Sequence, residues 1–130
     1  MELKIISWNI RGLNSFDKIN VIKDIVKKER VSVIAIQETK MSKVSDWFIK
    51  SFWGSDSYDW LHIPSNDRSG GIILVWDDSV LKMERELVGE HSISIEVSSV
   101  TDNFKWLFST AYAPNSPADK LNFLEELELI

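Results

Sequence analysis

The fold class is decided by residues 3–36, which read LKIISWNIRGLNSFDKINVIKDIVKKERVSVIAI. The stretch opens on a short apolar run, residues 3–8, whose side chains do not alternate strictly, as is typical of a strand covered on both faces. Residues 31–36 form a second such run, rich in β-branched side chains. Between them lies a helical pattern of the length that a crossover between parallel strands needs, so the stretch predicts an α/β domain.

The crossover helix, residues 17–30, is predicted by apolar side chains one turn apart. These are Ile19, Ile22, Ile25 and Val26, with lysines between them. Asn14 or Ser15 precedes the pattern and suits the N-cap of a helix. Basic residues close the pattern, which is favourable at a helix C-terminus.

Downstream, the same patterns predict further strands and two more helices. The predicted strands are residues 58–63, 72–76, 80–88, 92–97 and 104–112, and the predicted helices are residues 44–53 and 118–130. No repeat or low-complexity tract divides the sequence, so we expect a single domain over residues 1–130. The last helical pattern runs to residue 130 without a Gly or Pro stop signal, which is a first indication of a C-terminally truncated domain.

Composition excludes several classes of function. The chain has 44% hydrophobic and 27% charged residues, as ordinary globular domains do, and no cysteine for a disulfide or a thiolate metal site. Its formal net charge of −5 argues against a protein that coats DNA by bulk attraction, but not against a nuclease whose acidic ligands are neutralised by a cation. The sequence has no signal peptide and no long apolar run, so it predicts an intracellular protein of the nucleus or cytoplasm, not secreted and without a membrane partner.

Two polar residues stand where the first two predicted strands end. Asn9 follows the strand of residues 3–8, and Glu38 follows the strand of residues 31–36. Ligands in α/β proteins bind at the carboxyl ends of strands, and hard cations such as Mg²⁺ prefer carboxylate oxygens. Taken singly, Asn9 is as readily the start of a turn, and Glu38 is more readily a solvated carboxylate.

Two further motifs lie downstream. Tyr112 ends the strand of residues 104–112, and Asn115 follows the rigid Pro114, so two hydrogen-bonding side chains share one rim. The paired Gly70 and Gly71 permit either a close backbone approach or a tight hairpin turn, and we favour the turn. The two histidines, His62 and His91, have no neighbouring Asp, and we expect both to be structural or solvent-facing.

The order and the residues of these motifs resemble those of a known family. Ser-Trp-Asn-Ile-Arg-Gly-Leu-Asn at residues 7–14, Gln-Glu-Thr at 37–39, Ser-Gly-Gly at 69–71 and Tyr-Ala-Pro-Asn at 112–115 are similar to motifs of the endonuclease/exonuclease/phosphatase superfamily. Within it, the sequence most resembles the apurinic-like endonuclease domain of LINE-type (non-LTR) retrotransposons. The resemblance spans nearly the whole chain.

The resemblance implies a fold, a reaction and a set of roles. The fold is the N-terminal part of the four-layered α/β/β/α sandwich of the deoxyribonuclease-like class, and the reaction is hydrolysis of a phosphodiester, usually the nicking of DNA, with Mg²⁺ or Mn²⁺. By position, Glu38 is expected to bind the metal and Asn9 to hold the metal or the attacking water. Tyr112 is expected to orient or protonate near the scissile phosphate, and Asn115 to contact the phosphate. These roles agree with how one cation and neutral donors stabilise phosphoryl charge.

The sequence also departs from the family pattern. Family members carry a later Gly-Asp-Phe-Asn-like motif and a Ser-Asp-His-like motif, and neither occurs here. Loss of a general base costs about 10²–10⁴-fold in rate, so we expect weak metal binding and activity that is impaired or absent. Three alternatives stay open: completion by a partner chain or by downstream sequence, a non-catalytic nucleic-acid- or protein-binding remnant, and a phosphatase of the same superfamily. Arg11, Lys40 and Arg68 at the presumed rim are compatible with phosphate contact.

A structural expectation follows from the missing motifs. If the absent half of the domain supplies most of the second sheet, the first sheet loses its cover and leaves apolar surface exposed. Open sheet edges add to that hazard. We therefore expect a tendency to self-associate through an uncovered sheet. We further expect Asn9, Glu38 and Tyr112 to cluster only if the first two strands and the Tyr112 strand share one sheet.

Overall fold

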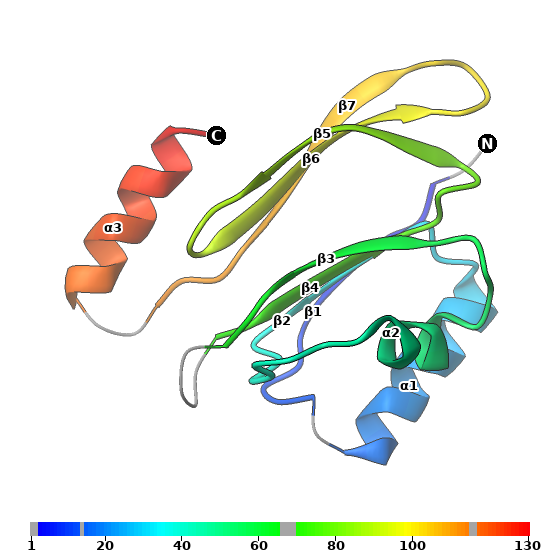
Figure 1. The fold of residues 1–130 in the computed structure, drawn as a ribbon, viewed down its shortest axis with the longest axis horizontal. Coiled ribbons are helices and arrows are strands. Elements are labelled where there is room, and N and C mark those ends of the chain that lie inside the picture. The colour runs from blue at the N-terminus through cyan, green and yellow to red at the C-terminus, as the bar shows by residue number, and fades with distance from the viewer. Residues whose placement is uncertain (1–2, 14, 66–69, 115–116) are drawn as a thin grey trace.

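The computed structural model describes residues 3–13, 15–65, 70–114 and 117–130. Every predicted strand and helix is present in it, with bounds shifted by no more than two residues (Figure 1). In chain order the elements are β1 (Ile5–Asn9), α1 (Phe16–Glu29), β2 (Val33–Gln37), α2 (Asp46–Trp53), β3 (Asp59–Ile63), β4 (Ile72–Trp76), β5 (Leu81–Val88), β6 (Ser92–Ser99), β7 (Lys105–Ala111) and α3 (Pro117–Glu128).

The first sheet has the strand order β1-β2-β4-β3. β1 and β2 are parallel, with Asn9 opposite Gln37, and this confirms the predicted crossover unit. The other two pairings are antiparallel. Every residue of β2 and β4 is buried, which explains why these two strands lack an alternating pattern in the sequence.

Helices α1 and α2 cover one face of this sheet (Figure 1). Ser15 and Ser45 cap them, each accepting a hydrogen bond from the backbone N–H three residues later, and this selects Ser15 from the two predicted caps of α1. The helices bury Ile22, Val26, Ile49 and Phe52 against Ile34, Ile36, Ile73 and Val75 of the sheet. Among the helices of the described segments, none has the length and apolarity that crossing a membrane demands.

The second sheet is the antiparallel meander β5-β6-β7, and it lies against the other face of the first sheet (Figure 1). Ile93, Ile95 and Val97 of β6 point inward and share a buried cluster with Val33 and Ala35 of β2. The alternate residues Ser94, Glu96 and Ser98 lie on the opposite face of β6, where both serines are nonetheless buried. Two sheets packed face to face, with helices outside, confirm the expected fold class.

The first sheet is therefore not left uncovered. We expected the first sheet to be exposed only if most of the second sheet came from sequence absent here. Strands β5, β6 and β7 already form a three-stranded second sheet. The second sheet buries the facing side chains of the first sheet, and Trp76 of β4 on that face is 1% exposed. The outward face of the second sheet carries mainly serines and charged residues, with Leu87 and Leu107 as exposed apolar residues among them.

Helix α3 stands apart from both sheets (Figure 1). None of its residues is buried. Glu126 anchors it to the turn before β6, because its carboxylate accepts hydrogen bonds from the backbone N–H groups of Glu90 and His91 and from the Ser92 hydroxyl. Phe123 adds an edge-on contact with the His91 ring.

Gly71 marks the closest approach of two loops in the first sheet. Its carbonyl accepts from the N–H of Thr39 at 3.2 Å, and the carbonyl of Gly70 accepts from the N–H of Lys40 at 2.9 Å. A Cβ on Gly71 would overlap the Thr39 hydroxyl, and the residue has a φ of 93°. The glycine pair thus permits a close backbone approach, in addition to the hairpin between β3 and β4 that we favoured.

This geometry predicts the effect of adding one methyl group. We expect Gly71→Ala to lower the free energy of unfolding by about 1–3 kcal/mol more than Gly54→Ala, since overpacking adds to backbone strain. Gly54 is the matched control, because it caps α2 with a φ of 81° but has open space where a Cβ would stand. Urea unfolding of both variants measures the difference. Equal losses would show that the Thr39 contact does not constrain the loop.

Candidate active site

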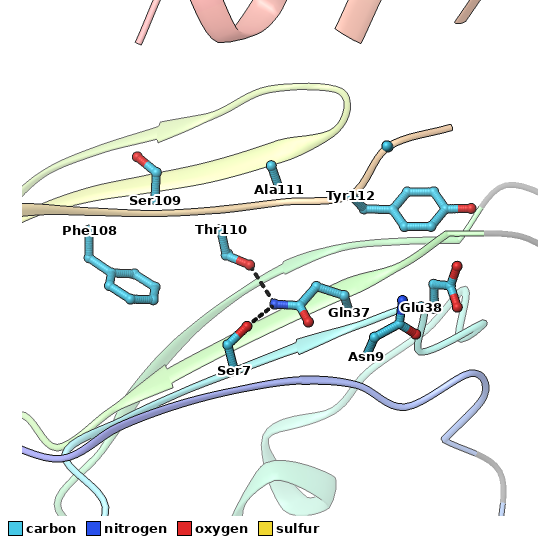
Figure 2. Close-up of a pocket in the computed structure, with 10 residues that line it drawn as sticks. Ser7, Asn9, Gln37, Glu38, Phe108, Ser109, Thr110, Ala111 and Tyr112 are labelled. Carbon is cyan, nitrogen blue, oxygen red and sulfur yellow. Dashed lines mark hydrogen bonds between the residues drawn. The ribbon is translucent and has the colours of Figure 1, made fainter. Parts of the chain in front are cut away.

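An open cleft of about 460 Å³ lies between the carboxyl ends of β1 and β2 on one side and β7 on the other (Figure 2). Its walls come from both sheets. The lining residues are Ser7, Asn9, Gln37, Glu38, Phe108, Ser109, Thr110, Ala111, Tyr112 and Ala113. Three of the four residues predicted for the site, Asn9, Glu38 and Tyr112, therefore meet at one place, while Asn115 lies outside the described residues.

Asn9 and Glu38 stand at one end of the cleft, with their side chains turned toward the same space (Figure 2). Asn9 is the last residue of β1 and is exposed, and Glu38 comes directly after β2. Glu38 has a φ of 54°, a conformation that costs free energy in a residue other than glycine. The loop after β1 holds it there, since the N–H of Gly12 donates to the carbonyl of Glu38 at 2.7 Å. Strain kept in place this way is common at functional sites.

Tyr112 closes the same end of the cleft from the second sheet (Figure 2). Its backbone N–H donates to the carbonyl of His91 at 2.9 Å, and its ring lies over Gly70. Burial raises the pKa of the Tyr112 phenol, the charge of Glu38 raises it further, and the backbone of Gly70 lowers it by a smaller amount. The phenol therefore keeps its proton at neutral pH and is available as a hydrogen-bond donor.

The expectation that these residues must share one sheet is wrong. β1 and β2 belong to the first sheet and β7 to the second, yet the cleft brings them together. The physical reason is that the two sheets pack face to face, so β7 lies over the ends of β1 and β2 rather than beside them. Side chains then converge across the gap between the sheets instead of along one sheet edge.

Gln37 lines the cleft and belongs to the Gln-Glu-Thr motif at 37–39, but the sequence assigned it no role. It is 9% exposed, and its Nε2 donates to the Ser7 hydroxyl at 2.8 Å and to the Thr110 hydroxyl at 2.9 Å (Figure 2). A signal for it exists in the sequence: a polar residue that ends a wholly apolar buried strand needs a partner for its amide. Its partner on β7 is 73 residues away along the chain, which no local pattern reveals.

The two histidines lie away from the cleft, in line with the expected structural roles. His62 is on β3, and burial lowers the pKa of its imidazole despite an opposing hydrogen bond to the backbone of Met41, so the ring is neutral at pH 7. His91 precedes β6 and its ring meets Phe123 at a centroid distance of 6.0 Å. Neither residue lines the cleft.

The donor groups of the cleft fit a weakly held hard cation. Glu38 offers a carboxylate and Asn9 a carboxamide oxygen, both of which Mg²⁺ accepts. Within the described segments, no group of three or more His, Cys, Asp or Glu side chains is placed to hold a metal ion. This does not exclude Mg²⁺, which is commonly bound by one or two carboxylates together with waters and substrate phosphates. The residues present fit that mode and not a closed protein cage.

Comparison with known proteins gives a consistent result. A model of the endonuclease/exonuclease/phosphatase family matches residues 6–129. Among solved structures, the AP endonuclease LMAP from Leishmania major superposes with a TM-score of 0.62 at 19% identity, over 93% of this chain and 44% of that one. The 3′ phosphatase NExo from Neisseria, bound to a product DNA hairpin, gives 0.69 at 14% identity, over 97% and 50%. D. rerio TDP2, complexed with a single-strand DNA product, gives 0.66 at 15% identity, over 98% and 52%.

At such low identities the structures are alike in fold alone. The chain spans about half the length of the solved structures it matches. Among curated proteins, no sequence matches the chain significantly.

The charge of Glu38 near Tyr112 predicts a change in the pKa of the phenol when that charge is removed. Tyr58 and Tyr112 are the two tyrosines of the chain, so a Tyr58→Phe background leaves Tyr112 as the one phenol to observe. In that background we expect Glu38→Gln to lower the pKa of Tyr112, because one of the charges that raises it is removed. The pKa should still exceed that of free tyrosine, since burial remains. Phenolate absorbance against pH measures both values. An unchanged pKa would place the Glu38 charge too far away to act on the phenol.

Proposed function

Because the chain belongs to the endonuclease/exonuclease/phosphatase family, we propose that its cleft serves metal-dependent hydrolysis of a phosphodiester, with DNA as substrate. One observation carries the proposal: Asn9, Glu38 and Tyr112 reach the same cleft from three different strands. The choice of DNA is supported by two structures of similar fold, one complexed with a single-strand DNA product and one bound to a DNA hairpin. An intracellular place of action, in the nucleus or cytoplasm, follows from that substrate.

Each residue has a role that its position supports. Glu38 would hold the cation through its carboxylate, with Asn9 beside it on the cation or on the attacking water. Tyr112 keeps its proton on the phenolic oxygen and donates a hydrogen bond to a phosphate oxygen. Asn115 is proposed as a second phosphate contact on the strength of its motif. When bound, Mg²⁺ or Mn²⁺ would polarise the phosphoryl group and screen its charge.

The described part of the cleft holds no histidine and one carboxylate. A general base that prepares water contributes about 10²–10⁴-fold to such a reaction. We therefore propose that residues 1–130 form a single domain that carries part of a catalytic site, binds the cation weakly and by itself cleaves DNA at close to the background rate.

A finer assignment within the family rests on the amino-acid sequence of the motifs. We propose that the chain derives from a LINE-type retrotransposon endonuclease, as residues 7–14 and 37–40 resemble those proteins most. Translating the genomic sequence that flanks the coding region tests this. A neighbouring reverse transcriptase frame supports the assignment, and a phosphatase gene context opposes it.

A non-catalytic role in DNA binding is the second candidate, and one observation favours it. Arg11 and Lys40 each lie two residues beyond a cleft residue, Asn9 and Glu38. Both side chains are exposed, and both residues have a left-handed backbone, with φ of 55° and 57°. The loops that carry them are joined by a hydrogen bond from the N–H of Leu13 to the carbonyl of Thr39. Two cations thus flank the site on an otherwise acidic protein.

Metal binding provides the direct test of the proposed function. We expect Mn²⁺, titrated by electron paramagnetic resonance, to bind one weak site that Glu38→Gln removes, because the described cleft then has no carboxylate. Glu86→Gln is the matched control, as Glu86 is an exposed carboxylate on β5. The same samples with supercoiled plasmid should show nicking near background. If the wild type nicks DNA robustly and Glu38→Gln abolishes the nicking, the proposal that the site is incomplete is wrong. If Glu38→Gln leaves Mn²⁺ binding unchanged, Glu38 is not the metal ligand.

Salt dependence tests the contact with DNA. We expect the double variant Arg11→Gln, Lys40→Gln to weaken duplex binding regardless of sequence and to reduce the slope of log K against log salt by about 2, since each substitution removes one cation from a phosphate. Lys27→Gln, Lys28→Gln makes the same change of charge at the end of α1 and is the control. Fluorescence anisotropy over a salt series gives both slopes. Equal effects of the two doubles would mean that net charge, rather than the cleft rim, governs binding.

A further inference from the structure

The buried amide of Gln37 joins three strands from two sheets. Its two Nε2 hydrogens go to different hydroxyls, Ser7 on β1 and Thr110 on β7 (Figure 2). The bond to Thr110 crosses from the first sheet to the second. Both partners are hydroxyls, and each can accept from an amide without a charge being buried.

The three residues of this bridge line the same cleft, and each is within two residues of Asn9, Glu38 or Tyr112 along its strand. Ser7 is two residues before Asn9, and Thr110 is two residues before Tyr112, so each pair lies on one face of its strand. Gln37 directly precedes Glu38. A shift of any of these strands at the bridge therefore moves a cleft residue by a similar distance.

The strands need such a bridge because of their place in the sheets. β1 is at the end of the first sheet and β7 at the end of the second, so in the described structure each has a neighbour on one side alone. Ladder hydrogen bonds fix β1 against β2 and β7 against β6, but they do not fix β1 against β7. Nonspecific apolar contact tolerates small displacements, whereas a hydrogen bond weakens steeply beyond its normal length.

We propose that Gln37 is a positioning residue, whose amide sets the width of the cleft by clamping β1 and β7 to β2 so that Asn9, Glu38 and Tyr112 face one bound cation and phosphate. The proposal rests on the proposed function, since it assigns the use of that same cleft. The amide nitrogen of Gln37 is already engaged by Ser7 and Thr110, which is why we assign the residue to positioning. It acts through the strands that carry the cleft residues, as residues that orient metal ligands do.

Two measurements separate positioning from general stability. The first is the distance between spin labels at Lys23→Cys on α1 and Leu107→Cys on β7, two exposed sites on opposite outer faces of the layered structure. The chain has no native cysteine, so labelling is specific. The second is the Mn²⁺ affinity. Thermal melting monitored by circular dichroism shows that each variant is folded under the conditions used.

The variants differ in hydrogen bonding more than in shape. Gln37→Met and Thr110→Val remove the bridge at similar volume, and Thr110→Ser keeps the hydroxyl and serves as the rescue. Ser98→Ala is the control, because it removes a hydrogen bond to Glu84 in the same sheet and neither of these residues lines the cleft. We expect a broader or shifted distance distribution and about a tenfold loss of Mn²⁺ affinity in Gln37→Met and Thr110→Val, as for other residues that orient metal ligands. Thr110→Ser and Ser98→Ala should match the wild type.

The outcomes are distinguishable. A distance distribution that Gln37→Met and Thr110→Val leave unchanged, in folded protein, overturns the positioning role. A changed distribution with unchanged Mn²⁺ affinity also overturns it, since the width of the cleft would then not matter to the site. If the wild type binds no Mn²⁺ while the distribution still responds, the clamp stands and the proposed metal-dependent function fails.

Discussion

The burial of β2 on both faces is the constraint from which the rest of the structure follows. Its side chains alternate between two cores: Ile34 and Ile36 face the helices, and Val33 and Ala35 face the second sheet. The alternation directs Gln37 to the second-sheet side, where a buried amide must find hydrogen-bond partners. It also determines where the strand ends and hence where Glu38 enters the cleft. Slipping β2 by one residue would exchange its two faces and destroy both cores.

Much of this was predictable from the sequence, for a clear reason. The described elements are short runs with strong local signals, and the sequence predicts each of them. Asn9 and Glu38 were predictable as neighbours because a helix of crossover length between two buried strands brings their ends together. The motif of Tyr112 predicts that it belongs to the site, but the sequence did not predict that its strand belongs to the second sheet. Membership of a sheet depends on pairing among β5, β6 and β7 and on packing over β2, which are long-range interactions. The bridge from Gln37 to Thr110 was beyond local patterns for the same reason.

The function that we propose for the cleft depends on its local charges rather than on the net charge of the protein. The chain carries a formal net charge of −5, and this net charge alone would disfavour binding to nucleic acid. Locally, the cleft holds one carboxylate and a phenol that keeps its proton, and two exposed basic residues flank it. These are the groups on which the proposed phosphodiester chemistry rests. Membership of the endonuclease/exonuclease/phosphatase family and this local chemistry support each other, although the chain spans about half of the solved relatives.

Helix α3 has a consequence for how the molecule opens. It buries none of its residues and is anchored at the Glu126 carboxylate, so little apolar burial opposes its separation from the sheets. Stability in proteins is distributed over cooperative units, and a unit with few buried contacts opens far more often than the core. The backbone amides of α3 should exchange their hydrogens with solvent long before those of β2.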